Sequence, residues 1–281
     1  MRIEYRPMSK EDLALAVDWA AHEGWNPGLE DVEAFYAADP GGYLMAYANG
    51  EPAASISIVR YGESFAFLGL YITRKDLRGQ GIGHGLWRHA IASLGDRTIG
   101  LDGVVEQQPN YRKSGFEYAH RNVRMSGIST ADMPVDQRIA TIGRGLHRTV
   151  VSHDREHFPE ERENFLKEWL APGSASRRGF AVVEDGDMKG YGTIRACRDG
   201  FKIGPLFAEG EEVADLLFRA LAGSVRGQEV ILDIPEPNAG AQALAERYEL
   251  SPVFETARMY KGKPPKLPLE RIFGITTFEL G

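Results

Sequence analysis

The chain has 281 residues, of which 43% are hydrophobic and 26% charged, a composition typical of folded proteins and a length that favours two domains. The formal net charge of −7 argues against a general nucleic-acid binder, because neutralising phosphates needs clustered Lys and Arg. The single cysteine, Cys197, excludes a disulfide framework and is expected to be a small buried residue. Residues 1–6 carry no apolar signal core and no apolar run reaches membrane-spanning length, so we expect a cytoplasmic protein.

The first elements follow from hydrophobic spacing and from turn residues. Ser9 is placed to cap a first helix, and Asp39-Pro40 ends a second one. Asn49-Gly50 is the strongest short hairpin signal, so the strands on either side of it should pair. The pattern predicts helices at 11–22 and 29–38 and strands at 3–6, 43–48 and 53–60.

A strand over 65–72 leads through a polar turn into the glycine-rich loop 78–83, which opens directly onto a helix. Unpaired N–H groups and the helix dipole make such an N-terminus attractive to an anion, and glycines let the backbone approach a phosphate. The loop has no G-x-x-x-x-G-K-[ST] pattern, so it is not a Walker-type loop. His84 stands where the dinucleotide pattern G-x-G-x-x-G needs its third glycine, so that motif fails as well.

Arg78-x-x-Gly81-x-Gly83 after a strand resembles the pyrophosphate-binding loop of the GNAT superfamily of acetyl-CoA-dependent N-acetyltransferases. The segment from Asn110 to Phe116 resembles the GNAT pattern F-Y-x-K-x-G-F, with Tyr111 at the tyrosine that protonates the leaving thiolate. One helix and one strand, at 98–105, separate the two motifs, as the family requires. The resemblance implies that acetyl-CoA is bound, without any metal, by Leu70, Tyr71, Ile72, Arg78, Gly79, Gln80, Gly81, Ile82, Gly83 and His84.

One position departs from the family pattern. Many members carry an asparagine six residues before the tyrosine, where it holds the pantetheine arm, and this chain has Val105 there. Gln107 or Gln108 would then have to make that contact.

The loop between the first two helices borders the acceptor pocket in GNAT folds. There Trp25 and Asn26 are candidate substrate-binding residues, and Glu23 is a candidate catalytic carboxylate that orients the amine or takes its proton. An equally supported alternative is a capping loop with Trp25 packed on the core. Asp102 and Glu106 are the next carboxylates to consider.

The second half of the chain repeats the plan of the first. Gly204 answers Gly69, Asp233 answers Asp102 and Arg258 answers Arg124, at nearly constant offsets of 135, 131 and 134 residues. A constant offset indicates a duplicated domain, with a Ser/Gly/Thr/Asp-rich linker at 126–133. We therefore expect a catalytic GNAT domain at 1–128 and a degenerate GNAT-like domain at 134–281.

The second copy has lost the features of the first. Glu209, Glu211 and Glu212 replace the glycine loop and would repel a pyrophosphate, and Tyr248, loosely aligned with Tyr111, is expected only to pack. The segment from Asp154 to Arg162 resembles the second-domain signature D-R-x-x-F-x-x-x-R of tandem-GNAT proteins.

Two other features of the second half need an interpretation. His153 and His157 share a helix face, but no third ligand is evident and the run reads as a solvated face, so no metal site is expected. A strand at 272–278, after a stiff basic spacer, is expected to dock near the domain interface.

The sequence thus predicts an α/β protein of two GNAT-like domains in tandem, each a mixed twisted sheet flanked by helices. The implied activity is acetyl transfer from acetyl-CoA to a primary amine, with a small molecule favoured over a protein. The alternative is a non-catalytic acyl-CoA-binding sensor or interaction protein. The expected partners are acetyl-CoA and an amine acceptor, with no nucleic acid and no membrane, and the chain is expected to be a monomer or a homodimer.

Overall fold

The computed structural model describes residues 1–281, and its strands form one thirteen-stranded sheet. The first half of the chain contains β1 (Ile3–Pro7), α1 (Lys10–His22), α2 (Asp31–Ala38), β2 (Tyr43–Ala48), β3 (Glu51–Tyr61), β4 (Phe65–Thr73), α3 (Ile82–Ala92), β5 (Thr98–Val104), α4 (Gln108–Lys113) and β6 (Glu117–Ile128). The second half contains β7 (Ile139–Thr141), α5 (His147–Arg155), α6 (Glu163–Trp169), β8 (Arg177–Glu184), β9 (Asp187–Ala196), β10 (Phe201–Ala208), α7 (Glu211–Gly223), β11 (Glu229–Pro235), α8 (Ala239–Arg247), β12 (Ser251–Lys261) and β13 (Ile272–Gly274).

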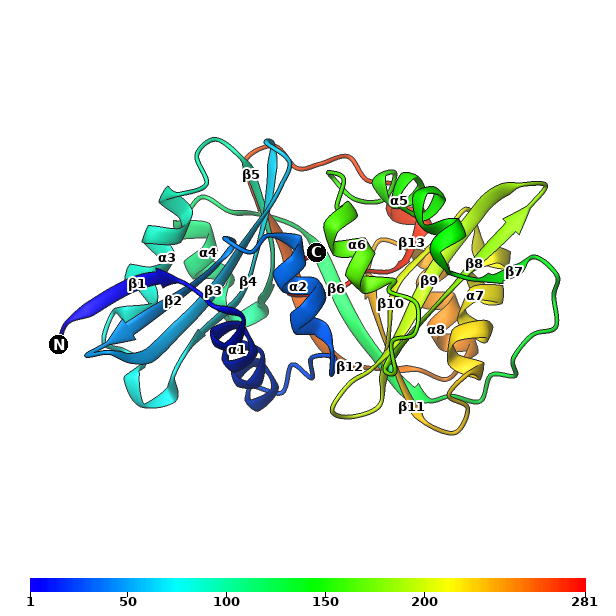
Figure 1. The fold of residues 1–281 in the computed structure, drawn as a ribbon, viewed down its shortest axis with the longest axis horizontal. Coiled ribbons are helices and arrows are strands. Elements are labelled where there is room, and N and C mark those ends of the chain that lie inside the picture. Colours follow the sequence, from blue (N-terminus) through cyan, green and yellow to red (C-terminus); the bar gives the residue numbers. More distant parts are fainter.

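The two halves exchange their last long strands. The strand order is β1-β2-β3-β4-β5-β12-β6-β11-β10-β9-β8-β7, so β12 completes the sheet of the first half and β6 completes that of the second. Both strands cross the region between the two lobes in Figure 1 and pair with each other there. The domain boundaries expected at residues 128 and 134 therefore stay a prediction, because each of the two sequence segments contributes one strand to the sheet of the other half.

The exchange explains two pairs of repeated residues. Arg258 on β12 lies opposite Asp102 on β5, and Arg124 on β6 lies opposite Asp233 on β11. Each arginine donates two hydrogen bonds of 2.7–2.8 Å to its buried aspartate. Replacing one member of a buried ion pair lowers stability, because the remaining charge is left without compensation. The same Asp–Arg pair is thus made twice, both times across the exchange.

Each half has a parallel strand pair that separates partway along. β4 pairs with β5 only as far as Leu68 and Leu101, and β10 pairs with β11 only as far as Ile203 and Leu232. In the first half the gap stays open. In the second half β13 enters it and pairs with β10.

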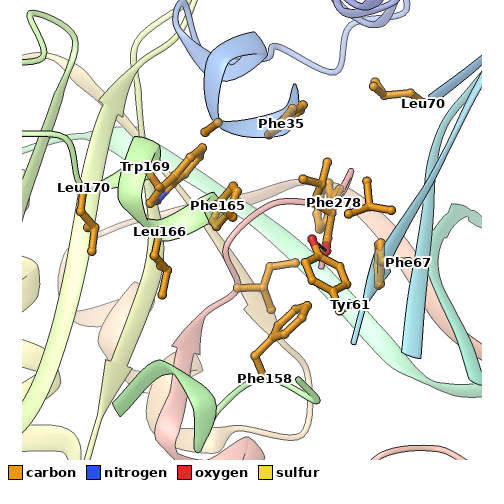
Figure 2. Packing of buried hydrophobic residues seen from close by; sticks show 14 of the residues in the cluster. Phe35, Tyr61, Phe67, Leu70, Phe158, Phe165, Leu166, Trp169, Leu170 and Phe278 are labelled. Atoms are coloured by element: carbon orange, nitrogen blue, oxygen red, sulfur yellow. Dashed lines mark hydrogen bonds between the residues drawn. The ribbon is translucent and has the colours of Figure 1, made fainter. Parts of the chain in front are cut away.

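The largest buried cluster, of 31 residues, is shared by the two lobes. Figure 2 shows Phe278, from the C-terminal segment, between Phe67 on β4 and Phe165 on α6. In Figure 1 the helix α2 faces the second lobe, where it packs on α6. A shared apolar core of this kind argues against free movement of the two lobes.

Several local expectations are confirmed. Ser9 caps α1 in a capping box with Asp12, and β2 and β3 form the hairpin around Asn49-Gly50. Cys197 is buried, and Tyr248 packs on Phe218 with ring centroids 4.5 Å apart. None of the helices combines the length and the apolar character needed to cross a membrane.

Three expectations need correction. Residues 126–128 belong to β6 rather than to a linker, because they pair with β11. The strand expected at 272–278 is regular only as β13, although the segment docks between the lobes as expected. His153 and His157 are 8% and 2% exposed, so the expected solvated face was wrong. His153 lies on α5 and its ring packs against Tyr191, whereas His157 follows the end of α5 and its ring packs against Phe207.

Candidate active site

A cavity of about 620 Å³ opens where β4 and β5 separate. Its floor and one side come from β4 and from the end of β5, and its mouth reaches Arg78 and Gly79 of the glycine loop. Tyr111, on α4, faces it from the β5 side. The gap between two parallel strands thus connects the glycine loop to the tyrosine that the sequence singled out.

The glycine loop presents a row of unpaired N–H groups. Gly79 and Gly81 have φ of +78° and +80°, which side chains with a β-carbon rarely adopt. Gly81 is the N-cap of α3 and supplies no capping side chain, and the N–H groups of residues 79–84 have no partner within the protein. Gln80, Gly81 and His84 are exposed beyond the mouth of the cavity. Such an N-terminus is built to receive an anion.

Gly83 has a different task from the exposed glycines. A β-carbon there would lie 2.4 Å from Oγ1 of Thr73, so its absence lets α3 sit directly on β4. Ile82 is buried beside it in the core of the first half. These two residues fix the position of the helix, while the loop before them keeps its backbone free.

The strand β4 is irregular at the cavity. Leu70 has φ of +45°, and its carbonyl accepts a 2.8 Å hydrogen bond from Oγ of the buried Ser55. The pairing of β3 with β4 shifts by a residue at this point. Because the partner strand β5 has already turned away, the edge of β4 from Leu70 to Thr73 offers backbone groups to the cavity.

Tyr111 is held in place by close packing. Its ring stacks on Trp87 with centroids 5.5 Å apart, and a β-carbon on Gly103 would lie 2.2 Å from its Cε2. Its hydroxyl has no hydrogen-bond partner in the protein. Burial raises the pKa of Tyr111 to about 12, so the phenol stays protonated near neutral pH and is suited to donate a proton.

The far end of the cavity is built by residues that the sequence did not point to. Phe254 and Thr256 come from the exchanged strand β12, and Phe278 and Glu279 from the C-terminal segment. They lie more than a hundred residues from Tyr111 in sequence and belong to no recognisable motif. The only signal for them was the expectation that the C-terminal segment docks at the interface.

The residues predicted from the first helical connection lie in different places. Trp25 lines the cavity and also packs on the shared core, and its role in substrate binding stays a prediction. Asn26 is outside the cavity: its side chain donates to the carbonyl of Asp199 at 2.7 Å and accepts from the Asp199 N–H at 3.1 Å. A substrate role for Asn26 therefore finds no support in this geometry, and its contacts join the two lobes.

The predicted carboxylates also differ in their surroundings. Glu23 lines the cavity, but its carboxylate accepts a 2.7 Å hydrogen bond from Arg78 and lies 3.8 Å from Lys75, beside the glycine loop. Its catalytic role stays a prediction. Asp102 is bound to Arg258, and burial raises its pKa. Glu106 and Gln107 line the cavity near Tyr111, whereas Gln108 does not.

Metal ligation finds no candidate. No group of three or more His, Cys, Asp or Glu side chains is arranged to hold a metal ion. His157 Nδ1 contacts the carbonyl of His153 at 2.8 Å. Burial lowers the pKa of His153 to about 4, which describes a neutral packed ring.

Comparison with known proteins identifies the family of the chain. Residues 11–116 match the model of the acetyltransferase (GNAT) family, and residues 150–274 match a second acetyltransferase (GNAT) domain. The chain is 33% identical to holothin acyltransferase of Pseudoalteromonas sp. (strain SANK 73390) over 277 residues, which is 98% of this chain and 94% of the relative. It is 24% identical to an uncharacterized N-acetyltransferase of Bacillus subtilis (strain 168), over 69% of each chain.

Solved structures show the same fold. A candidate acetyltransferase from Pyrococcus horikoshii superposes with a TM-score of 0.84 at 24% identity, covering 99% of this chain and 96% of that one. A tandem GNAT protein from the clavulanic acid biosynthesis pathway superposes with a TM-score of 0.63 at 16% identity, covering 94% and 100%.

The chain belongs to the GNAT family of acyltransferases and carries two GNAT domains in tandem. The mixed α/β fold expected from the sequence is confirmed. Membership of the family implies an acyl-CoA donor and an amine acceptor.

Proposed function

We propose that this protein transfers an acetyl group from acetyl-CoA to the amine of a small molecule, in the cavity of the first half. The observation that carries the proposal is the continuity of that cavity. It connects a loop of free N–H groups, an open edge of β4 and a protonated tyrosine, which are the parts that acyl transfer from a thioester needs.

The residues divide the chemistry between them. The N–H groups of residues 79–84 would hold the pyrophosphate, with the exposed Arg78 beside them. The backbone of β4 from Leu70 to Thr73 would pair with the pantetheine arm and stabilise the oxyanion that forms at the thioester carbonyl. Tyr111 would protonate the leaving thiolate, and a raised pKa keeps that proton available.

Two observations favour a small acceptor. The cavity volume lies in the range of about 300–1,000 Å³ that is usual for small-molecule sites, and the C-terminal segment closes its far end. A relative that covers nearly the whole chain is described as an acyltransferase for holothin. Holothin is therefore a reasonable first acceptor to test.

We place acyl-CoA binding in the first half alone. Pro205 stands in the second half where Leu70 stands in the first, and a proline offers no N–H to a ligand. The gap between β10 and β11 is filled by β13, with Asn238 donating a 2.9 Å hydrogen bond to the carbonyl of Ile272. Glu211 and Glu212 occupy the first turn of α7, where a pyrophosphate would meet their charge.

A screen of amines with acetyl-CoA, following release of the CoA thiol and the mass of the product, tests the proposal. The set contains holothin, other small aromatic and aliphatic amines, and peptides with a free N-terminus or lysine. We expect product with a small amine and none with the peptides. A protein that binds acetyl-CoA but releases no thiol with any acceptor would instead be a sensor.

A further inference from the structure

Glu279 is a buried carboxylate without a protein partner. It is 4% exposed and lines the active-site cavity, yet no protein donor lies within hydrogen-bonding distance of its side chain and it forms no ion pair. Burying an unpaired charge costs several kcal/mol, so carboxylates in such positions normally have a donor. An acceptor in the cavity would supply one.

Each of the neighbouring cations already contacts another group. Arg124 is bound to Asp233 at 2.7 Å, and Arg195 lies 3.1 Å from Asp31. Lys202 donates to the carbonyl of Trp25 at 3.0 Å. All three cations lie close enough to interact electrostatically with Glu279, but none contacts it. They place positive charge near Glu279 while leaving its oxygens free.

The backbone of Glu279 lies directly against the irregular part of β4. A β-carbon on Gly69 would come within 2.2 Å of the Glu279 carbonyl oxygen, so the glycine is what allows the contact. Gly69 precedes Leu70, where β4 opens to the cavity. The carboxylate thus belongs to a segment that touches the strand expected to hold the thioester.

The segment that carries Glu279 is fixed at several points. Tyr61 donates a 3.1 Å hydrogen bond to the carbonyl of Leu280, and the Leu280 N–H donates to Oγ1 of Thr277 at 2.9 Å. Phe278 packs in the shared core with Arg124 4.7 Å from the centre of its ring. A carboxylate on so well anchored a segment is preorganised to meet a substrate.

From this geometry we infer that Glu279 accepts a hydrogen bond from the attacking amine and takes its proton; the inference rests on the proposed acetyl transfer. The amine nitrogen forms a bond to the thioester carbon, and one amine proton passes to the Glu279 carboxylate. The carbon–sulfur bond breaks, and the sulfur takes the phenolic proton of Tyr111. Return of the proton from Glu279 to Tyr111 through solvent restores both groups.

The other carboxylates of the cavity are less suited to this task. Glu23 is bound to Arg78 at the mouth, and Asp102 is held by Arg258 and by Asn122. Glu106 follows β5 on the same side as Tyr111. Glu279 alone combines deep burial with free oxygens at the end that Trp25 and Phe278 line.

The test compares Glu279→Gln with the native chain and with Glu270→Gln, an exposed carboxylate of the same C-terminal segment that lies outside the cavity. Steady-state kinetics use acetyl-CoA and the best amine of the screen, with holothin tried first, and calorimetry gives the acetyl-CoA Kd. We expect Glu279→Gln to lower kcat/KM for the amine by about 10²- to 10⁴-fold, the usual contribution of a group that accepts a proton in the transition state. The acetyl-CoA Kd and the thermal midpoint should stay near native, as should all values of Glu270→Gln.

Glu279→Asp keeps the carboxylate on a shorter side chain and should retain more activity than Glu279→Gln. It also serves as a second variant in case Glu279→Gln folds poorly. Native kcat/KM in Glu279→Gln would overturn the inference, as would a fall in acetyl-CoA affinity that accounts for all the lost activity. Failure of the proposed function looks different: the native chain would bind acetyl-CoA and acetylate no amine at all.

Discussion

Tyr111 is the residue on which the proposed chemistry depends most directly. Its ring is fixed between Trp87 and Phe116, and its hydroxyl has no competing partner. Tyr111→Phe should lower kcat by about 10²- to 10⁴-fold, the usual contribution of general acid catalysis. The acetyl-CoA Kd should change little, because the proton is donated to the leaving group and not to the bound ground state. Turnover kinetics and calorimetry on the same variant check both parts, and unchanged kcat would remove Tyr111 from the mechanism.

The sequence pointed to Arg78 and Gly79, to β4 and to Tyr111, which the structure brings to one cavity, and it missed most of the residues that line the other end of that cavity. The glycine loop and Tyr111 sit in short motifs whose residue types follow from local backbone needs. Phe254, Phe278 and Glu279 reach the cavity only because strands exchange and a distant segment docks. No local sequence pattern predicts which distant residues will meet in this way. Asn26, a candidate for substrate binding, instead makes a hydrogen bond between the two lobes.

The seating of α3 on β4 gives a prediction at the scale of elements. Gly83→Ala would place a β-carbon 2.4 Å from Oγ1 of Thr73, and overpacking of this kind costs about 1–3 kcal/mol. The helix must then shift away from the strand and take its N-terminal N–H groups with it. We expect a lower thermal midpoint and weaker acetyl-CoA binding, read by thermal unfolding and calorimetry.

Gly143→Ala is the matched control, because nothing lies within 4 Å of a β-carbon at that position and its φ of −127° suits any residue. Native acetyl-CoA affinity in Gly83→Ala would contradict this account of the glycine.

In the first half, hydrophobic spacing predicted α1, α2, α3 and β1 to β5, with errors at their ends, whereas α6 and α8 of the second half were not predicted. β6 runs to Ile128 because its end pairs with β11 of the other half, a partner that its own sequence does not reveal. β13 stops at Gly274 because the following residues turn into the shared core rather than along β10. The repeat of Asp102 and Arg258 as Asp233 and Arg124 was visible in the sequence, but its meaning needed the strand order.

The whole molecule should lose stability in mild acid. Burial lowers the pKa of His120 and His153 to about 4 and also lowers that of His157, so the folded chain binds fewer protons than the unfolded chain below about pH 6.5. The stability that these neutral rings contribute is complete above pH 6.5 and is lost as pH falls toward 4. Each ring can contribute a slope of up to about 1.4 kcal/mol per pH unit.

Urea unfolding at pH 7, 6 and 5 measures this slope in a window where ordinary carboxylates scarcely titrate. His120→Gln should flatten it. A free energy of unfolding that stays constant or rises from pH 7 to pH 5 would show that the three rings are not buried as neutral groups.

The central claim for the whole molecule is that one of its two related halves binds the acyl donor. Calorimetric titration of the native chain with acetyl-CoA tests this most directly, with Gly81→Asp as the partner variant. The aspartate would bring a negative charge to the expected pyrophosphate site, at a residue whose φ is +80°. We predict one site per chain and no detectable binding in Gly81→Asp, whose fold circular dichroism would check. Two sites per chain, or native affinity in the folded variant, would contradict the account.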